Sequence, residues 1–164
     1  MAETEDIFFL VDPGSAEAEQ CFKEVKAFIL ERLPAAETEH VGSTAVPGCA
    51  GKGDVDVVIR VGSADFESAQ SILDLSLPRS RRNDATEGYI EYDYARNDQV
   101  AAVHLIARHG THDVFQRFKA LLLSDPGLVA QYNSLKREWD GRDMEKYRLA
   151  KAVFIESVLA ARRC

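Results

Sequence analysis

Two aspartates separated by a single residue stand at the head of an apolar, β-branched run, DVDVVIRV, that begins at Asp54. Successive side chains of a strand point to opposite faces, so Asp54 and Asp56 share one face. The other face carries only aliphatic side chains, Val55, Val57, Ile59 and Val61. Because Mg²⁺ binds hard oxygen ligands such as carboxylates, the pair indicates a site for one or two Mg²⁺ ions at the entrance to a half-buried strand.

A Gly-Ser pair, Gly42 and Ser43, precedes these carboxylates. Glycine lets a backbone approach an anion closely, and backbone N–H groups together with the Ser43 hydroxyl are donors for phosphate oxygens. Lys52, between the turn and the carboxylates, could neutralise phosphate charge. This combination suits in-line displacement on a triphosphate, in which metal ions activate an attacking hydroxyl and stabilise the leaving pyrophosphate.

Each of these features has a plainer interpretation when taken alone. An isolated Asp-x-Asp is more often a solvated strand end than a metal site, and Gly-Ser turns are common. Their order along the chain, with an apolar strand attached, favours the phosphate-and-metal interpretation.

A predicted β-hairpin brings further polar groups to the same sheet. The segments GYIEYDYA and QVAAVHLIA are separated by a turn with Asn97-Asp98 at its tip. A two-residue loop places Glu91 opposite His104 and Asp93 opposite Ala102. Glu91 or Asp93 is then a candidate third carboxylate, and His104 a candidate to position an acceptor or a metal-bound water. The plainer alternatives are exposed strand carboxylates and a partly buried histidine.

The other elements follow from hydrophobic spacing. IFFLVDP suggests a short edge strand, and Asp12-Pro13 a helix start before a helix that stops at Pro34. ETEHV predicts a strand running into the Gly-Ser turn, and residues 64–75 predict a helix. After the hairpin the pattern is helical, with Ser124-Asp125-Pro126 as a start signal. The predicted fold class is α/β (α+β), a small sheet with helices mainly on one face and a helical C-terminal half.

Length and charge limit the classes of function. The 164 residues predict one domain, 1–164, and the net charge of −7 argues against broad binding to nucleic acid or to an anionic membrane. The acidic start lacks the features of a secretory signal, so we expect a cytoplasmic protein. The cysteines, Cys21, Cys49 and Cys164, are odd in number and widely spaced, which indicates neither a disulfide framework nor a zinc site.

The turn region resembles the signature of the GrpB family. HVGSTAVPGCAGK followed by VDV matches it at His40, Gly42, Ser43, Thr44, Val46, Pro47, Gly48, Lys52 and Asp56, and the resemblance extends from about residue 7 to 161. It implies the nucleotidyltransferase fold with a small mixed sheet, in which a Gly-Ser turn followed by Asp-x-Asp holds Mg²⁺ and a nucleoside triphosphate. On this resemblance Thr44 joins the triphosphate-binding turn, and Lys151 matches a recurring position that could reach the triphosphate or the acceptor.

The chain also departs from the family pattern. It has a complete Asp-x-Asp where many members have an apolar residue in place of Asp54, which favours metal binding. A usual His-x-His is reduced to one histidine, His104, and an aspartate and an arginine are replaced by Ala120 and Leu123. Two hypotheses remain. One is a Mg²⁺-dependent transfer of a nucleoside monophosphate to a hydroxyl or amine acceptor. The other is a non-catalytic module for nucleotide or anion sensing or for protein interaction.

Overall fold

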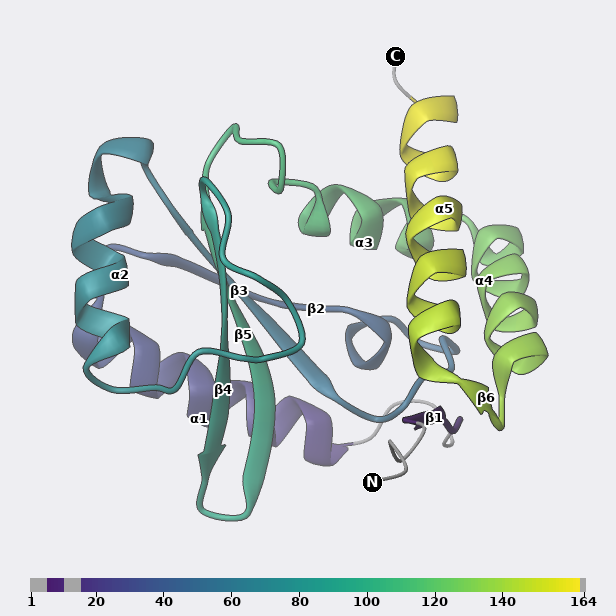
Figure 1. Cartoon of the computed structure of the whole chain (residues 1–164), viewed down its shortest axis with the longest axis horizontal. Helices are drawn as coiled ribbons and strands as arrows, with labels where there is room; N and C mark the ends of the chain where they lie inside the picture. The colour runs from purple at the N-terminus through teal and green to yellow at the C-terminus, as the bar shows by residue number, and fades with distance from the viewer. Residues whose placement is uncertain (1–5, 11–15, 163–164) are drawn as a thin grey trace, which may run out of the picture.

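The computed structural model describes residues 6–10 and 16–162 (Figure 1). Helices and strands alternate in its first part, and helices dominate the last. In chain order the elements are β1 (Ile7–Phe8), α1 (Ala16–Arg32), β2 (Glu37–Val41), the 3₁₀ turn η1 (Ser43–Ala45), β3 (Val55–Val61), the 3₁₀ turn η2 (Ser63–Asp65), α2 (Phe66–Asp74), β4 (Tyr89–Arg96), β5 (Gln99–Ala107), α3 (Phe115–Ser124), α4 (Pro126–Trp139), β6 (Arg142–Asp143) and α5 (Met144–Ala161). The predicted helix start at Asp12-Pro13 lies outside the described residues.

The main sheet has the strand order β2-β3-β5-β4. β3 and β5 pair in parallel at its centre, and β2 and β4 flank them in antiparallel pairing, so the predicted mixed α/β class is confirmed. The hairpin turns at Asn97 and Asp98, whose φ angles of 51° and 61° fit the type I′ geometry that matches strand twist. Its register pairs Glu91 with His104 and Asp93 with Ala102, as predicted.

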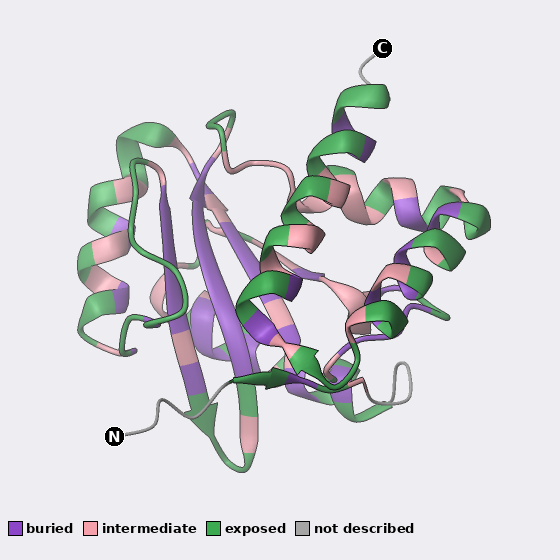
Figure 2. Ribbon diagram, turned by 45° about the vertical axis from the view of Figure 1, so that its right-hand side comes forward, coloured by how far each residue is buried: buried purple, intermediate pink, exposed green. Residues whose placement is uncertain are grey.

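One face of the sheet carries the main core. The aliphatic side of β3, including Val57 and Ile59, packs with Val103 and Leu105 of β5 against α1 and α2. Figure 2 shows these central strands buried between the surrounding helices. Burial of this aliphatic surface is the main favourable contribution to folding, which explains why the strand alternates so regularly.

The opposite face is covered at its centre, although the sequence pattern suggested an open face. Val58 packs with Val41, Tyr89 and Ile106, and Phe115 of α3 lies against this cluster. Val58 is itself apolar and points away from the main core, so a second layer is needed to bury it. The polar side chains of this face therefore lie to either side of that cluster, with Asp56 near the start of β3 and Arg60 near its end.

The C-terminal helices pack against the segment after β2 and not against the main core. Val46 and Cys49 of that segment share a cluster with Leu122, Tyr132 and Val158. Figure 1 shows α3, α4 and α5 grouped beside the turn that follows β2. None of the helices in the described part of the chain is long and apolar enough to cross a membrane.

A partly buried ion-pair cluster joins α3 to the sheet. Arg60 of β3 donates two hydrogen bonds of 2.7 Å to Asp113, which precedes α3, and two of 2.8 Å to Glu37 of β2. The hydrogen bond from Arg60 is the largest cause that lowers the pKa of Asp113. The carboxylate therefore contributes stability that is present above the ordinary aspartate pKa and lost as the pH falls through the lowered value.

Replacing Asp113 by Asn should destabilise the protein at pH 7 by about 1–3 kcal/mol, because a charge-assisted pair becomes a neutral contact. This corresponds to about 2–10 °C in Tm at this chain length. The difference in Tm from the wild type should shrink as the pH falls below about 4, the ordinary aspartate pKa, toward the lowered pKa of the folded carboxyl. Thermal unfolding between pH 3 and pH 7 measures it, with the exposed Asp84→Asn as the control. An equal difference at all pH values would contradict the role of the charge.

Candidate functional site

The Gly-Ser turn lies directly against Asp56. The pairing of β2 with β3 sets Val41 opposite Asp56, so Gly42 follows beside that carboxylate. Gly42 has a φ of +77°, and a Cβ added to it would stand 2.5 Å from Asp56 Oδ2. Both the backbone angle and the close approach therefore require glycine. The predicted turn and the predicted carboxylate form one site.

Ser43 is held by a buried lysine of α4. Lys136 is fully buried, and its ammonium donates to Ser43 Oγ at 2.7 Å and to the carbonyl of Ala50, and lies 3.4 Å from Cys49 Sγ. Burial lowers the pKa of Lys136 to about 8. An ammonium has only donors, so Ser43 Oγ accepts and its own O–H is free to point to another acceptor.

The same helix fixes the rest of the turn segment. Asn133, one turn before Lys136, accepts from the N–H of Ala50 and donates to the carbonyl of Gly48, both at 2.8 Å. Gly51 packs so closely that an added Cβ would lie 2.8 Å from Ser43 Oγ. Because α4 bonds the segment at several points, the position of Ser43 depends on the C-terminal half of the chain.

The Thr44 hydroxyl is already used inside the protein. It donates to the carbonyl of Asp54 at 3.1 Å and contacts His40 Nε2 at 2.9 Å. His40 is buried and stacks on Phe22 of α1. Thr44 therefore links the turn to the start of β3, and its hydroxyl is not a free donor for a ligand.

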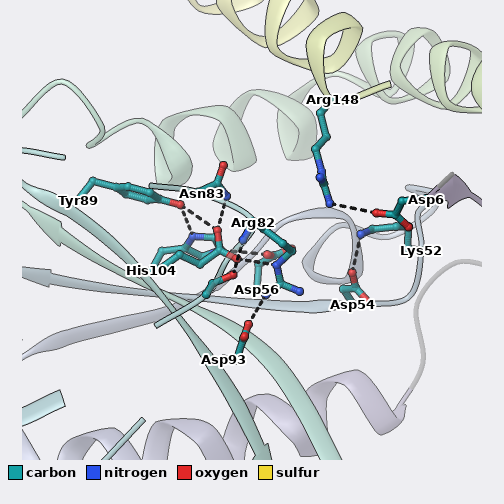
Figure 3. A network of polar contacts seen from close by, with 12 residues as sticks. Asp6, Lys52, Asp54, Asp56, Arg82, Asn83, Tyr89, Asp93, His104 and Arg148 are labelled. Carbon is teal, nitrogen blue, oxygen red and sulfur yellow. Dashed lines mark hydrogen bonds and ion pairs between the residues drawn. The ribbon is translucent and has the colours of Figure 1, made fainter. Parts of the chain in front are cut away.

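A chain of hydrogen bonds runs from Asp56 across the sheet (Figure 3). Asp56 Oδ1 is 3.0 Å from His104 Nε2, His104 Nδ1 is 3.1 Å from the Tyr89 hydroxyl, and this hydroxyl donates to Glu91 Oε2 at 3.2 Å. A carboxylate only accepts, so His104 Nε2 donates to Asp56. His104 thus holds one oxygen of Asp56 and leaves Oδ2 beside Gly42.

Asp54 lies just before β3 and is exposed, whereas the sequence pattern placed it within the strand. It forms an ion pair of 3.0 Å with Lys52. Figure 3 shows this pair to one side of Asp56. Both side chains are accessible to solvent, so breaking this ion pair costs little free energy. Lys52 can then pair with an incoming anion, and Asp54 with an incoming cation.

Glu91 and Asp93 are joined by an arginine that the sequence reasoning did not single out. Arg82 donates to Glu91 Oε1 at 2.9 Å and to Asp93 Oδ1 at 2.7 Å, and Asn83 donates to Glu91 Oε2. The only signal in the sequence was the basic composition of the loop before β4. Glu91 is buried with both oxygens bonded, so it does not fit a metal ligand.

Opposite charges surround Asp56. Burial raises the pKa of this carboxyl, but the hydrogen bond and charge of His104 and the charges of Lys151 and Lys52 outweigh burial and bring it below its ordinary value. The charge of Lys151, on α5, also contributes to lowering the pKa of Lys136. Lys52 and Lys151, both predicted from the sequence, therefore lower the pKa of Asp56, although they lie far apart in the chain.

The carboxylates do not form a closed metal cage. Within residues 6–10 and 16–162, no three His, Cys, Asp or Glu side chains are grouped so that they could hold an ion. At phosphate sites Mg²⁺ commonly takes one or two carboxylates and completes its shell with phosphate and water oxygens. Asp54 and Asp56 Oδ2 fit that donor set.

The chain is similar in sequence and in structure to proteins of one family. A family model described as GrpB protein matches residues 10–161. A UPF0157 protein of Vibrio cholerae is 30% identical over 154 residues, which cover 93% of this chain and 81% of that protein. The crystal structure of a conserved GrpB protein from Enterococcus faecalis superposes with a TM-score of 0.70 and 17% identity, covering 94% of this chain and all of that one.

Two larger proteins share the fold. The structure of the GLD-2/RNP-8 complex matches with a TM-score of 0.55 and 14% identity, over 86% of this chain and 57% of that one. The poly(U) polymerase Cid1, in a structure described as bound to MgGTP, matches with a TM-score of 0.53 and 11% identity, over 74% and 41% of the two chains. These likenesses show a nucleotidyltransferase-like fold. With the family match over residues 10–161, the chain belongs to the GrpB family.

Proposed function

We propose that the protein is a Mg²⁺-dependent nucleotidyltransferase, which transfers a nucleoside monophosphate from a triphosphate to a hydroxyl or amine acceptor. The observation that carries the proposal is the close approach of Gly42 to Asp56, which brings the turn that we propose to bind phosphate beside the carboxylate that we propose to bind metal. The fold shared with a poly(U) polymerase described as binding MgGTP supports it.

The triphosphate is bound by the turn and the surrounding lysines. Ser43 donates its free O–H, because Lys136 already supplies the hydrogen bond that Oγ accepts. Lys52 leaves Asp54 and pairs with a phosphate, and Lys151 adds positive charge from α5. Gly42 allows the phosphates to approach the backbone. The contribution of Thr44 is structural, through its bond to Asp54.

Asp54 and Asp56 Oδ2 hold the metal ion together with triphosphate oxygens. Such an ion would supply charge neutralisation at the phosphates and Lewis-acid polarisation of a phosphoryl oxygen. His104 fixes Asp56 through Oδ1 and so aims Oδ2 at the turn. Because both ring nitrogens of His104 are already engaged, by Asp56 and by Tyr89, its contribution is to orient Asp56.

A non-catalytic nucleotide or anion sensor on the same scaffold is the second candidate. It is favoured by the ion pairs of Glu91 and Asp93 with Arg82, which leave no free third carboxylate on β4. Both candidates bind nucleotide at the turn. Only the enzyme releases pyrophosphate when an acceptor is present.

Replacing Asp56 by Asn should remove the Mg²⁺-dependent part of nucleotide affinity while leaving the shape of the side chain. Loss of one partner of a buried charge interaction costs about 2–5 kcal/mol, which is at least about thirtyfold in Kd. Calorimetry with ATP, GTP, CTP and UTP, with and without Mg²⁺, measures it. The control is Asp98→Asn at the hairpin tip. Unchanged Mg²⁺-dependent affinity in Asp56→Asn would reject the metal-ligand role.

Replacing Ser43 by Ala should weaken triphosphate affinity about fivefold or more, because one hydrogen bond to a charged group is lost. Affinity for the bare nucleoside should not change, since the hydroxyl faces the phosphates. Ser68→Ala, at an exposed position of α2, is the matched control. An equal loss for nucleoside and triphosphate would indicate a structural role for Ser43 instead.

The transfer reaction itself is tested by pyrophosphate release. The wild-type protein, Mg²⁺, each labelled triphosphate and an acceptor-containing cell extract should yield pyrophosphate and a labelled product. Asp56→Asn should yield neither. Nucleotide binding by the wild type without pyrophosphate release from any triphosphate would support the sensor.

A further inference from the structure

The segment before β4 places a permanent cation on the two carboxylates of β4. Glu91 is 3% exposed, and its oxygens accept from Arg82, Asn83 and Tyr89. A buried carboxylate is stable only when paired and hydrogen-bonded, and here the pairing is complete within the protein. Arginine stays protonated at any physiological pH, so this cation is not removed by titration.

Arg82 is fixed in this position by hydrogen bonds of the segment that precedes it. The N–H of Ser80 donates to the carbonyl of Glu91 at 2.8 Å, and the N–H of Asp93 donates to the carbonyl of Pro78 at 2.9 Å. The N–H of Arg82 itself donates to Ser80 Oγ at 3.1 Å. The segment thus runs along the free edge of β4, which delivers the guanidinium to Glu91 and Asp93 together.

The two sides of the site differ in how readily they can accept a metal ion. Asp54 and Lys52 form one solvent-accessible ion pair, and Asp56 Oδ2 faces the turn. A divalent cation at Glu91 and Asp93 would instead lie against the guanidinium, where repulsion between like charges opposes binding.

We propose that the guanidinium of Arg82 takes the place of a second metal ion beside Glu91 and Asp93. The site then binds the triphosphate with a single divalent ion, held by Asp54 and Asp56. This inference rests on the proposed nucleotide site. It departs from two-ion catalysis, in which a second metal occupies the neighbouring position. Arg82 is a positioning residue, because it holds Glu91, which fixes His104 through Tyr89.

The number of bound ions tests the proposal. Equilibrium dialysis against Mn²⁺ and α,β-methylene-ATP, with metal and nucleotide counted per chain, should give about one Mn²⁺ per bound nucleotide for the wild type. Arg82→Gln should bind about two, because Glu91 and Asp93 lose their cation. Arg82→Lys keeps the charge and should stay at about one. Arg81→Gln removes a neighbouring exposed arginine and is the matched control.

A second readout needs no nucleotide. Mn²⁺ alone should raise the Tm of Arg82→Gln by several degrees, about 5 °C at saturating ion, and should leave the wild type and Arg81→Gln nearly unchanged.

The possible results distinguish a failure of the Arg82 proposal from a failure of the proposed function. Two ions per nucleotide in the wild type, or one in Arg82→Gln with no response of its Tm to Mn²⁺, would overturn the role of Arg82 and leave the proposed function standing. Absence of any nucleotide binding by the wild type would overturn the proposed function and this inference with it. The wild-type count stands even if Arg82→Gln does not fold.

Discussion

The close approach of a backbone turn to a carboxylate governs the site. Antiparallel pairing of β2 and β3 sets Val41 opposite Asp56, so the residue after β2 must pass beside that side chain. Only glycine fits there, with a φ of +77° and no room for a Cβ. The alternating strand, the helices beneath it and the α4 side chains all serve to hold this approach in place.

Charge balance explains the arrangement around that contact. Asp54, Glu91 and Asp93 are each paired with a lysine or arginine of the chain, but the pairs differ in exposure. The Lys52–Asp54 pair is open to solvent and exchangeable, whereas Arg82 and Glu91 form a network with a buried acceptor. A weakly held pair can give way to a metal and a phosphate, and a buried network resists doing so.

Much of this structure follows from short-range rules. The alternation of the β3 segment, the two-residue hairpin at Asn97 and Asp98 and the resulting register of Glu91 with His104 were all predictable, because strand period and turn length fix which residues face each other. The proximity of Gly42 to Asp56 was expected from the resemblance to the GrpB family, whereas the antiparallel pairing of β2 with β3 that produces it was not predicted.

The parts that sequence reasoning missed depend on long-range packing. Lys136 matches a recurring position of the family, but no local pattern indicates that it is buried and reaches Ser43 across 93 residues of sequence. Arg82 came from a loop whose composition was basic but whose path along the edge of β4 is set by backbone bonds to Glu91 and Asp93. Val58 was placed on an open face because strand alternation does not show that α3 returns to cover it.

The most direct measurement is a crystal structure of the protein with Mn²⁺ and a non-hydrolysable triphosphate analogue. The account predicts an anomalous-scattering peak within coordination distance of Asp56 Oδ2, about 2.0–2.4 Å, with the triphosphate on the turn at Gly42 and Ser43. A nucleotide bound elsewhere, or an ion that leaves Asp56 uncoordinated, would contradict it.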